Sequence, residues 1–197
     1  MMHKQDIVQP SFDRRIVQNT SEKERIGKAV ASMIENGSSV FFDAGTTPLN
    51  VAKAIPANIA ITAITNSIMT AAELCTKPNI NVIMVGGELH HSSFSAVNNI
   101  AMETAERFTT DLAIISTKAI DVNTGLYETN LPLIEIKKTI AKRAEKVILA
   151  TDFSKFDEHA MCLSVAIDDI DVVVTDDKTP EDKLDILRAR GKQVVVV

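Results

Sequence analysis

The residues best suited to chemistry begin where an apolar run, 40–42, meets a carboxylate at Asp43. A short loop with Gly45, Thr46 and Thr47 follows, and Pro48 stands at an expected first helical position. A strand–loop–helix junction of this kind presents backbone amides and hydroxyls that hold a phosphate or a sugar. The alternative is helix capping by Thr46, and the two interpretations are compatible because both use the same amides.

Five further polar segments, one of which lies within an expected helix, are candidate ligand contacts. They are Asn66 with Ser67, Gly86 and Gly87 with Glu88, Lys118 after Ser116 and Thr117, and the lysines Lys137 and Lys155. Lysines supply charge to a phosphate, and glycines allow close approach of a ligand. Each segment also has a structural alternative: a helix cap, a bulge, a solvated lysine, or an ion pair between Asp152 and Lys155.

Short apolar runs alternate with helical patterns along the chain, which predicts a mainly parallel, doubly wound, Rossmann-like α/β sheet. Residues 1–19 are polar and are expected to form an irregular arm, and 20–197 form the folded domain. Ligands in such sheets bind outside the carboxyl ends of the strands, where all of these polar segments are expected. Strands are expected at 40–43, 59–65, 81–85, 112–116, 146–150, 171–175 and 193–197, and helices at 21–36, 48–54, 68–75, 96–108, 133–144 and 180–190.

Composition excludes several classes of protein. The 197 residues are 45% hydrophobic and 24% charged with a net charge of −5, which indicates a packed core and argues against a nucleic-acid-binding face. No apolar run is long enough to span a membrane, no signal peptide is recognisable, and two cysteines indicate a reducing cytoplasm. Spacing typical of a metal site, a nucleotide loop or a covalent nucleophile is absent, so we expect no cofactor, no metal and no catalytic residue.

Taken in order, these motifs resemble the C-terminal sensor domain of DeoR-type bacterial transcription repressors, from about residue 10 onwards. The matching segments are Phe42-Asp43-Ala44-Gly45-Thr46-Thr47, Thr65-Asn66-Ser67, Val85-Gly86-Gly87-Glu88-Leu89, Glu135-x-Lys137, Asp152-x-Ser154-Lys155-Phe156 and Ile170-Asp171-x3-Thr175-Asp176. Pro10-Ser11-Phe12-x2-Arg15 and Asn19-x3-Lys23 look like the start of that domain.

The resemblance implies a fold similar to ribose-5-phosphate isomerase and glucosamine-6-phosphate isomerase, a phosphorylated sugar as effector, and a homo-oligomer. It implies that DNA is bound through an N-terminal winged helix-turn-helix, for which this chain has no room. We therefore expect a cytoplasmic, non-enzymatic sensor that modulates a transcriptional regulator of sugar metabolism. A sugar-phosphate isomerase with Glu88 or Asp43 as base is the alternative. Lys118 departs from the family, which usually has an acid there, and its charge would favour a more acidic ligand.

Overall fold

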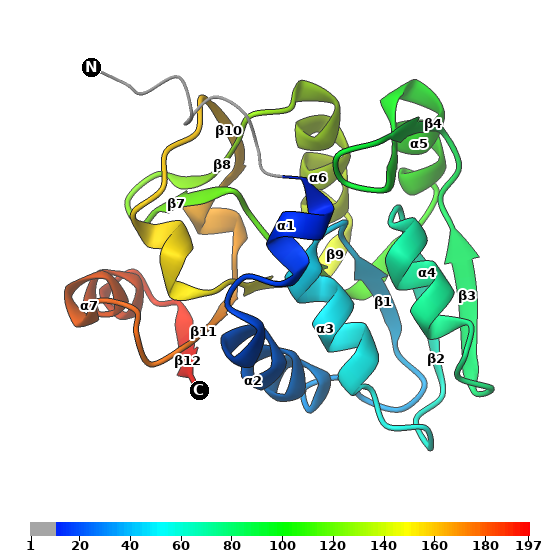
Figure 1. The fold of residues 1–197 in the computed structure, drawn as a ribbon, viewed down its shortest axis with the longest axis horizontal. Coiled ribbons are helices and arrows are strands. Elements are labelled where there is room, and N and C mark those ends of the chain that lie inside the picture. Colours follow the sequence, from blue (N-terminus) through cyan, green and yellow to red (C-terminus); the bar gives the residue numbers. More distant parts are fainter. Residues whose placement is uncertain (1–10) are drawn as a thin grey trace.

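The computed structural model describes residues 11–197, and its main feature is a seven-stranded parallel sheet (Figure 1). The strands are β1 (Ser39–Phe42), β2 (Ile61–Thr65), β3 (Ile80–Met84), β6 (Thr110–Ile115), β9 (Ala144–Ala150), β11 (Val172–Thr175) and β12 (Gln193–Val196). Their order is β12-β11-β9-β6-β1-β2-β3, and every neighbouring pair is parallel. The prediction of a mainly parallel, doubly wound α/β fold is confirmed.

Helices cover both faces of this sheet because its strands bury side chains on both sides. Phe42 belongs to a buried cluster with α2 (Thr20–Ala31), α3 (Thr46–Ala54) and α4 (Ile68–Leu74). Phe41, one position earlier, belongs to the opposite cluster with α5 (Asn98–Ala105), α6 (Leu131–Lys142) and α7 (Glu181–Ala189). The result is a three-layered molecule with one hydrophobic cluster on each side of the sheet (Figure 1).

The strand order reverses direction between β1 and β6. From β1 the chain adds β2 and β3 on one side, and from β6 it adds β9, β11 and β12 on the other. The connections leaving β1 and β6 therefore diverge at their carboxyl ends, which opens a crevice where ligands of such sheets bind. Asp43 and Ser116 are the residues that follow β1 and β6 at this point.

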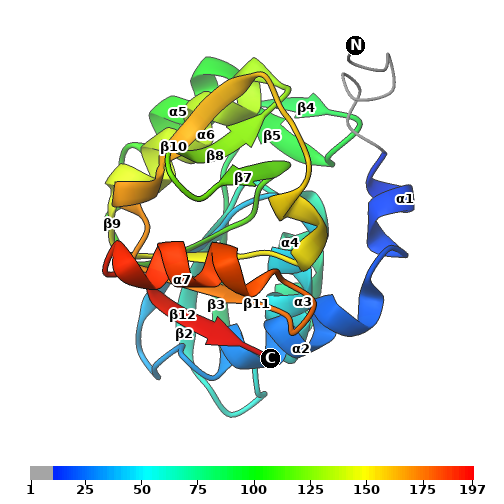
Figure 2. The ribbon, with the colours of Figure 1, turned by 90° about the vertical axis from the view of Figure 1, so that its left-hand side faces the viewer.

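Two small antiparallel sheets, which the sequence patterns did not predict, lie toward the end to which the β1 and β3 arrowheads point (Figures 1 and 2). One pairs β4 (Glu88–His90) with β5 (Ser95–Val97), and the other has the order β10-β8-β7. Its strands are β7 (Ala119–Asp121), β8 (Gly125–Glu128) and β10 (Cys162–Ala166), and short 3-10 helices, η1 and η2, span Phe153–Phe156 and Ile167–Asp169. Strands this short carry too few residues for an alternating pattern to stand out.

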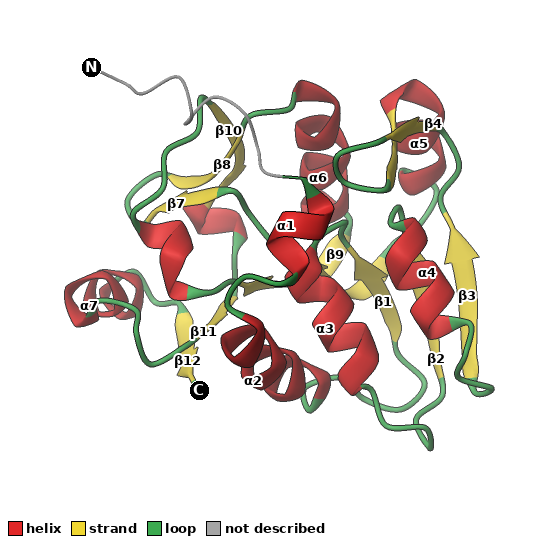
Figure 3. Ribbon diagram, viewed as in Figure 1, coloured by secondary structure: helices red, strands yellow, loops and turns green. Residues whose placement is uncertain are grey.

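The expectation of an irregular arm over 1–19 is wrong for part of that range, and 1–10 lie outside the described residues. A short helix, α1 (Phe12–Ile16), lies in front of the sheet above α3 (Figure 3). Phe12 is buried, and its ring meets that of Phe94 edge to face with centroids 5.5 Å apart. Its backbone N–H donates to the carbonyl of Ser92 at 3.1 Å. These contacts hold α1 against the β4–β5 loop.

Gly125 begins β8 and fixes how the β7–β8 hairpin packs against β10. Its φ is +142°, and a Cβ there would lie 2.2 Å from the carbonyl oxygen of Val165. Gly125→Ala is expected to lower the free energy of unfolding by about 2–4 kcal/mol, since it adds backbone strain and overpacking. Urea denaturation measures this loss. Gly86→Ala is the control, because a Cβ there meets nothing within 4 Å; equal losses in both variants would contradict the packing.

Candidate functional site

Two adjoining cavities lie at the crevice between β1 and β6. The first, the α1 cavity, has a volume of about 30 Å³ and is lined by Arg15, Gln18, Asn19, Lys23, Thr46, Thr47, Ser116, Thr117, Lys118, Asp152 and Lys155. The second, the Lys137 cavity, has a volume of about 20 Å³ and is lined by Arg15, Asp43, Ala44, Ser93, Ser116, Thr117, Glu128, Leu133 and Lys137. They share Arg15, Ser116 and Thr117, so they lie side by side and are treated as one candidate site.

Lys137 is the central charge of the second cavity and is almost fully buried. Its Nζ lies 3.0 Å from Asp43 Oδ2 and 2.7 Å from Glu128 Oε1, and it also donates to the carbonyl of Ser116. Burial acts to lower the pKa of Lys137, but the two carboxylates outweigh it and hold that pKa above its ordinary value. Lys137 is therefore a charged structural partner of both carboxylates, and the alternative of a solvated surface lysine is wrong.

Lys137 lies on α6, which packs on the face of the sheet opposite to α2, α3 and α4. Ile136 and Ile140 are buried against the sheet, and Pro132 lies in the first turn, where a missing N–H is tolerated. Asp43 Oδ2 also accepts from the backbone N–H of Ser116 at 3.2 Å. Lys137 thus ties β1, the segment after β6, and β8 together at one point.

Two cations of the N-terminal segment, Arg15 and Lys23, line the α1 cavity. Lys23, on the first turn of α2, is 3% exposed and donates to the carbonyls of Arg15 at 2.5 Å and Gln18 at 2.6 Å. Burial lowers the pKa of Lys23 to about 8. Burial also lowers the pKa of Arg15, against the carboxylates of Glu128 and Asp43. Two desolvated cations therefore share this wall, where a bound anion would stabilise their charged forms.

The segment after β9 supplies the facing wall through η1. Lys155 lines the cavity, 3.3 Å from Glu158 Oε1, and burial lowers its pKa. Asp152 is buried, caps η1 through the N–H of Ser154, and accepts from Asn19 Nδ2 at 2.8 Å. The alternative, an ion pair between Asp152 and Lys155, does not form. Asp152 accepts from Asn19 and Ser154, and Lys155 lies against Glu158.

Lys118 also lines the α1 cavity and forms an ion pair with Glu158. It is buried, so it is not a solvated lysine. Oε1 of the same Glu158 lies 3.3 Å from Lys155 Nζ, and one carboxylate cannot balance two lysines. The expectation of a more acidic ligand therefore stays a prediction.

The loop after β1 contributes the amino-terminal end of α3. Gly45 is the N-cap, and no side chain among the described residues caps it, so the alternative of capping by Thr46 is wrong. Thr46 and Thr47 are the first two helical residues and line the cavity, while Pro48 is third rather than first. A Cβ on Gly45 would lie 2.3 Å from Ser116 Oγ, so glycine lets this loop approach the segment after β6.

Five of the sequence-predicted residues lie away from both cavities. Asn66 and Ser67 are fully buried under β5: the N–H of Ala96 donates to Asn66 O at 2.8 Å, and Ser67 Oγ caps α4. The structural alternative, a helix cap, is therefore the role of Ser67. The exposed residues Gly86, Gly87 and Glu88 connect β3 to β4 and begin β4. Glu88 accepts a hydrogen bond from Asn98.

Several residues that line the site were not among the predicted contacts. Arg15, Asn19 and Lys23 stand in the motif at the start of the domain, but were not assigned to the ligand site. Ser116, Thr117 and Asp152 stand in the predicted loops beside residues that were chosen. Ser93 and Glu128 belong to the small antiparallel sheets or their loops, so only the tertiary fold places them here.

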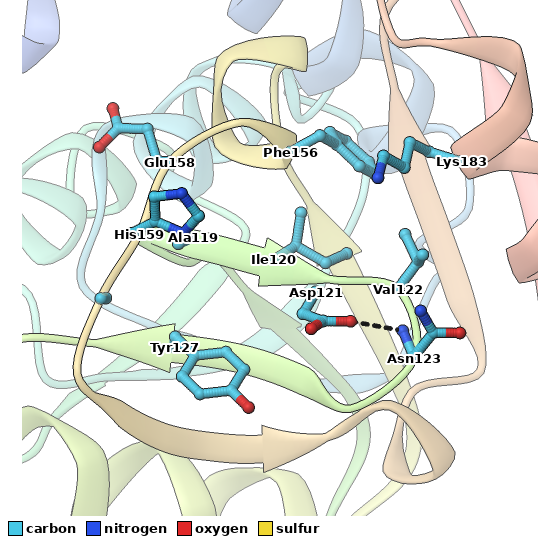
Figure 4. Close-up of a pocket in the computed structure, with 11 residues that line it drawn as sticks. Ala119, Ile120, Asp121, Val122, Asn123, Tyr127, Phe156, Glu158, His159 and Lys183 are labelled. Carbon is cyan, nitrogen blue, oxygen red and sulfur yellow. Dashed lines mark hydrogen bonds between the residues drawn. The ribbon is translucent and has the colours of Figure 1, made fainter.

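A larger hollow in the described part of the chain lies elsewhere, between β7, η1 and α7 (Figure 4). Its volume is about 380 Å³, and the side chains around it include Tyr127, Phe156, Glu158, His159 and Lys183. Asp121, Asn123 and His159 are exposed to solvent there. A polar ligand is held most strongly by desolvated charges, which the two smaller cavities supply. The candidate site is therefore the pair at the crevice.

Residues 11–197 hold no cluster of three or more His, Cys, Asp or Glu side chains that could ligate a metal ion. No helix in the same range is long and apolar enough to cross a bilayer.

Comparison with known proteins identifies the family. The model of the DeoR C terminal sensor domain matches residues 18–177. The chain is 33% identical to the glycerol-3-phosphate regulon repressor of Escherichia coli, covering 90% of this chain and 70% of that protein. It is 32% identical to the transcriptional regulator GolR of Listeria innocua, covering 85% and 66%. The chain belongs to the DeoR C-terminal sensor domain family, and it spans about two thirds of the length of these relatives.

Solved structures support the fold. Ribose 5-phosphate isomerase A from Methanocaldococcus jannaschii superposes with a TM-score of 0.52 at 13% identity, covering 71% of this chain and 55% of that one. The expected likeness to the ribose-5-phosphate isomerase fold is confirmed. The sequence relatives carry the names of transcriptional regulators, which supports a regulator domain rather than an isomerase.

Lys137→Met leaves Asp43 and Glu128 buried without their shared cation. We expect a loss of about 3–5 kcal/mol in the free energy of unfolding at pH 7, so this variant tests folding before binding. This loss in the free energy of unfolding should be smaller in acid, because protonation of Asp43 and Glu128 removes their uncompensated negative charge. Denaturant titrations from pH 4 to 8 measure both effects. Lys138→Met, on the exposed side of the same helix, is the control; a Lys137 variant as stable as this one would contradict the buried cluster.

Proposed function

We propose that the chain is the effector-sensing part of a DeoR-type transcriptional regulator, and that its effector is a phosphorylated sugar or polyol bound across the two cavities. The phosphate occupies the α1 cavity. In a longer protein of the relatives' size, the ligand state of this domain alters the binding of DNA by a separate domain in the cytoplasm. The supporting observation is the gathering of buried cations around the amino-terminal ends of two helices.

Those cations, Arg15, Lys23 and Lys155, all have pKa values lowered by burial. Desolvated charges of one sign disfavour each other, and an anion between them offsets both that repulsion and the loss of water. The amino-terminal ends of α2 and α3 add the positive ends of two helix dipoles, near Asn19 and Thr46. A phosphate dianion is the common metabolite group that matches this field.

The size of the site requires movement. The cavities of about 30 and 20 Å³ are far smaller than the roughly 300–1,000 Å³ of usual ligand pockets. The wall best placed to move is α1 with the turn to α2, a short segment joined to the rest by the contacts of Phe12, Lys23 and Asn19. A phosphate competes for Lys23 with the carbonyls of Arg15 and Gln18, so binding favours an outward position of α1. The ligand then shifts the equilibrium by its difference in affinity for the two positions.

The central test is stabilisation by phosphorylated ligands. Ribose 5-phosphate and glycerol 3-phosphate at millimolar concentration should raise the melting temperature, whereas ribose and glycerol should not, because binding to the native state stabilises it. Lys155→Ala should weaken the binding of these phosphates by roughly tenfold to a hundredfold, which is the contribution of a charge-assisted hydrogen bond.

The control for Lys155 is Lys146→Ala, an exposed lysine at the opposite end of β9. Calorimetric titration of both variants separates a local contact from a general change in charge. If a broad panel of phosphomonoesters binds neither the parent chain nor the control, the proposed function is wrong.

Lys23 makes phosphate binding depend on pH. A bound dianion favours the protonated lysine, so affinity should be fully present below pH 8 and fall as the pH rises through about 8, the pKa of Lys23 in the free chain. Phosphomonoesters are largely dianionic from pH 7 and fully so from pH 8, so the ligand's own titration does not lower the affinity in this range. Titrations at pH 7, 8 and 9 with Lys23→Met and Lys28→Met as control measure the effect. If phosphate affinity falls with pH as steeply in Lys23→Met as in the parent chain, Lys23 does not bind the phosphate.

A further inference from the structure

Glu128 presents one carboxylate oxygen that the ion cluster leaves unused. Oε1 accepts from Lys137, whereas Oε2 accepts no hydrogen bond from any residue that the structure describes. The side chain is 3% exposed and lines the Lys137 cavity. A buried carboxylate oxygen without a donor is costly, so native proteins retain one where a ligand or water completes it.

The adjoining carboxylate, Asp43, is bound through one oxygen. Asp43 Oδ2 accepts from both Lys137 and the N–H of Ser116. Glu128 Oε2 differs because it is fully buried and has no donor among residues 11–197. A hydroxyl of a ligand would supply the hydrogen bond that this oxygen lacks.

The two cavities adjoin at Arg15, Ser116 and Thr117, so a ligand with its phosphate in the first reaches Glu128 with its next groups once these side chains move apart. A space of about 20 Å³ is enough for a single hydroxyl or water. Charges around it are balanced, with Asp43 and Glu128 facing Lys137 and Arg15, so a neutral donor fits better than an ammonium group.

We propose that Glu128 is the specificity-determining residue of this site: its Oε2 accepts a hydrogen bond from a hydroxyl of the effector, and so selects hydroxylated phosphate esters over other phosphomonoesters. This inference rests on the proposed function and adds the group that reads the end of the ligand remote from phosphate. Binding strength and selectivity then come from different walls, the α1 cavity for phosphate and Glu128 for the hydroxyl.

The experiment compares matched ligands. Glycerol 3-phosphate is paired with propyl phosphate, ribose 5-phosphate with pentyl phosphate, and glucose 6-phosphate with glucosamine 6-phosphate. In the parent chain, at least one hydroxylated ester should bind roughly tenfold to a hundredfold more tightly than its alkyl partner. Glu128→Gln should reduce this ratio, and Glu128→Met should bring it close to one; because the ratio compares two ligands on the same variant, a general loss of phosphate affinity cancels in it.

Glu135→Gln is the matched control, since it removes one carboxylate from the exposed face of α6. It should leave every ratio as in the parent chain. Melting temperatures without ligand show whether each variant is folded, and the Gln variant, which keeps the shape of the side chain, carries the test if the Met variant is not.

Other outcomes overturn the inference in distinguishable ways. If alkyl phosphates bind but the hydroxyl ratio survives in both Glu128 variants, Glu128 is not the selective residue and the proposed function stands. If glucosamine 6-phosphate is preferred and Glu128→Gln removes that preference alone, the site reads an ammonium group. If no phosphomonoester binds the parent chain, the proposed function and this inference fail together.

Discussion

The buried contact of Lys137 with Asp43 and Glu128 is the constraint on which the rest of the site depends. It joins a helix from one layer to the residue that follows β1 and to an antiparallel hairpin. Taking three charges out of water is costly, and the cost is offset only while every partner is in place. The cluster therefore fixes the geometry of the crevice between β1 and β6. The cations of the N-terminal segment, by contrast, are held by backbone carbonyls and a short helix, which is why the movement that we propose is assigned to that segment.

The same contact bears on the choice between a sensor and an isomerase. A general base must be free to accept a proton from a substrate carbon. Asp43 is bound on one oxygen by Lys137 and the N–H of Ser116, and Glu128 shares the same lysine. Glu88, the other candidate base, is exposed on β4 and hydrogen-bonded to Asn98. The carboxylates nearest the cavity thus serve as fixed acceptors, which suits recognition of a ligand rather than its chemical conversion. This agrees with relatives named as transcriptional regulators.

The fold could be predicted from the sequence because buried parallel strands and capped helices leave strong local patterns. The same patterns predicted that the candidate site lies at the carboxyl ends of the parallel strands. Which loops on that edge meet was not predictable: Asn66 and Ser67 resemble the loop after β1, yet β5 covers them. Arg15 and Lys23 were missed because a polar segment gives no periodic signal of packing, although Phe12 anchors it. Glu128 was missed because β7 and β8 are too short to be recognised, and their pairing alone brings it to Lys137.

Under the proposed function, a fixed Lys137 cluster and a movable N-terminal segment account for how a small ligand acts at a distance. Lys23 donates to two carbonyls in the α1 segment, and Asn19, with a left-handed φ of 49°, donates to Asp152 on the opposite wall. Each of these contacts joins the N-terminal segment to the site through a group that a phosphate would contact or displace. An anion that takes Lys23 from the carbonyls weakens the hold on α1 and relieves the desolvation of the cations at the same time. The affinity for the ligand and the position of the segment entering the domain are therefore coupled by one set of hydrogen bonds, which is the physical requirement for a sensor.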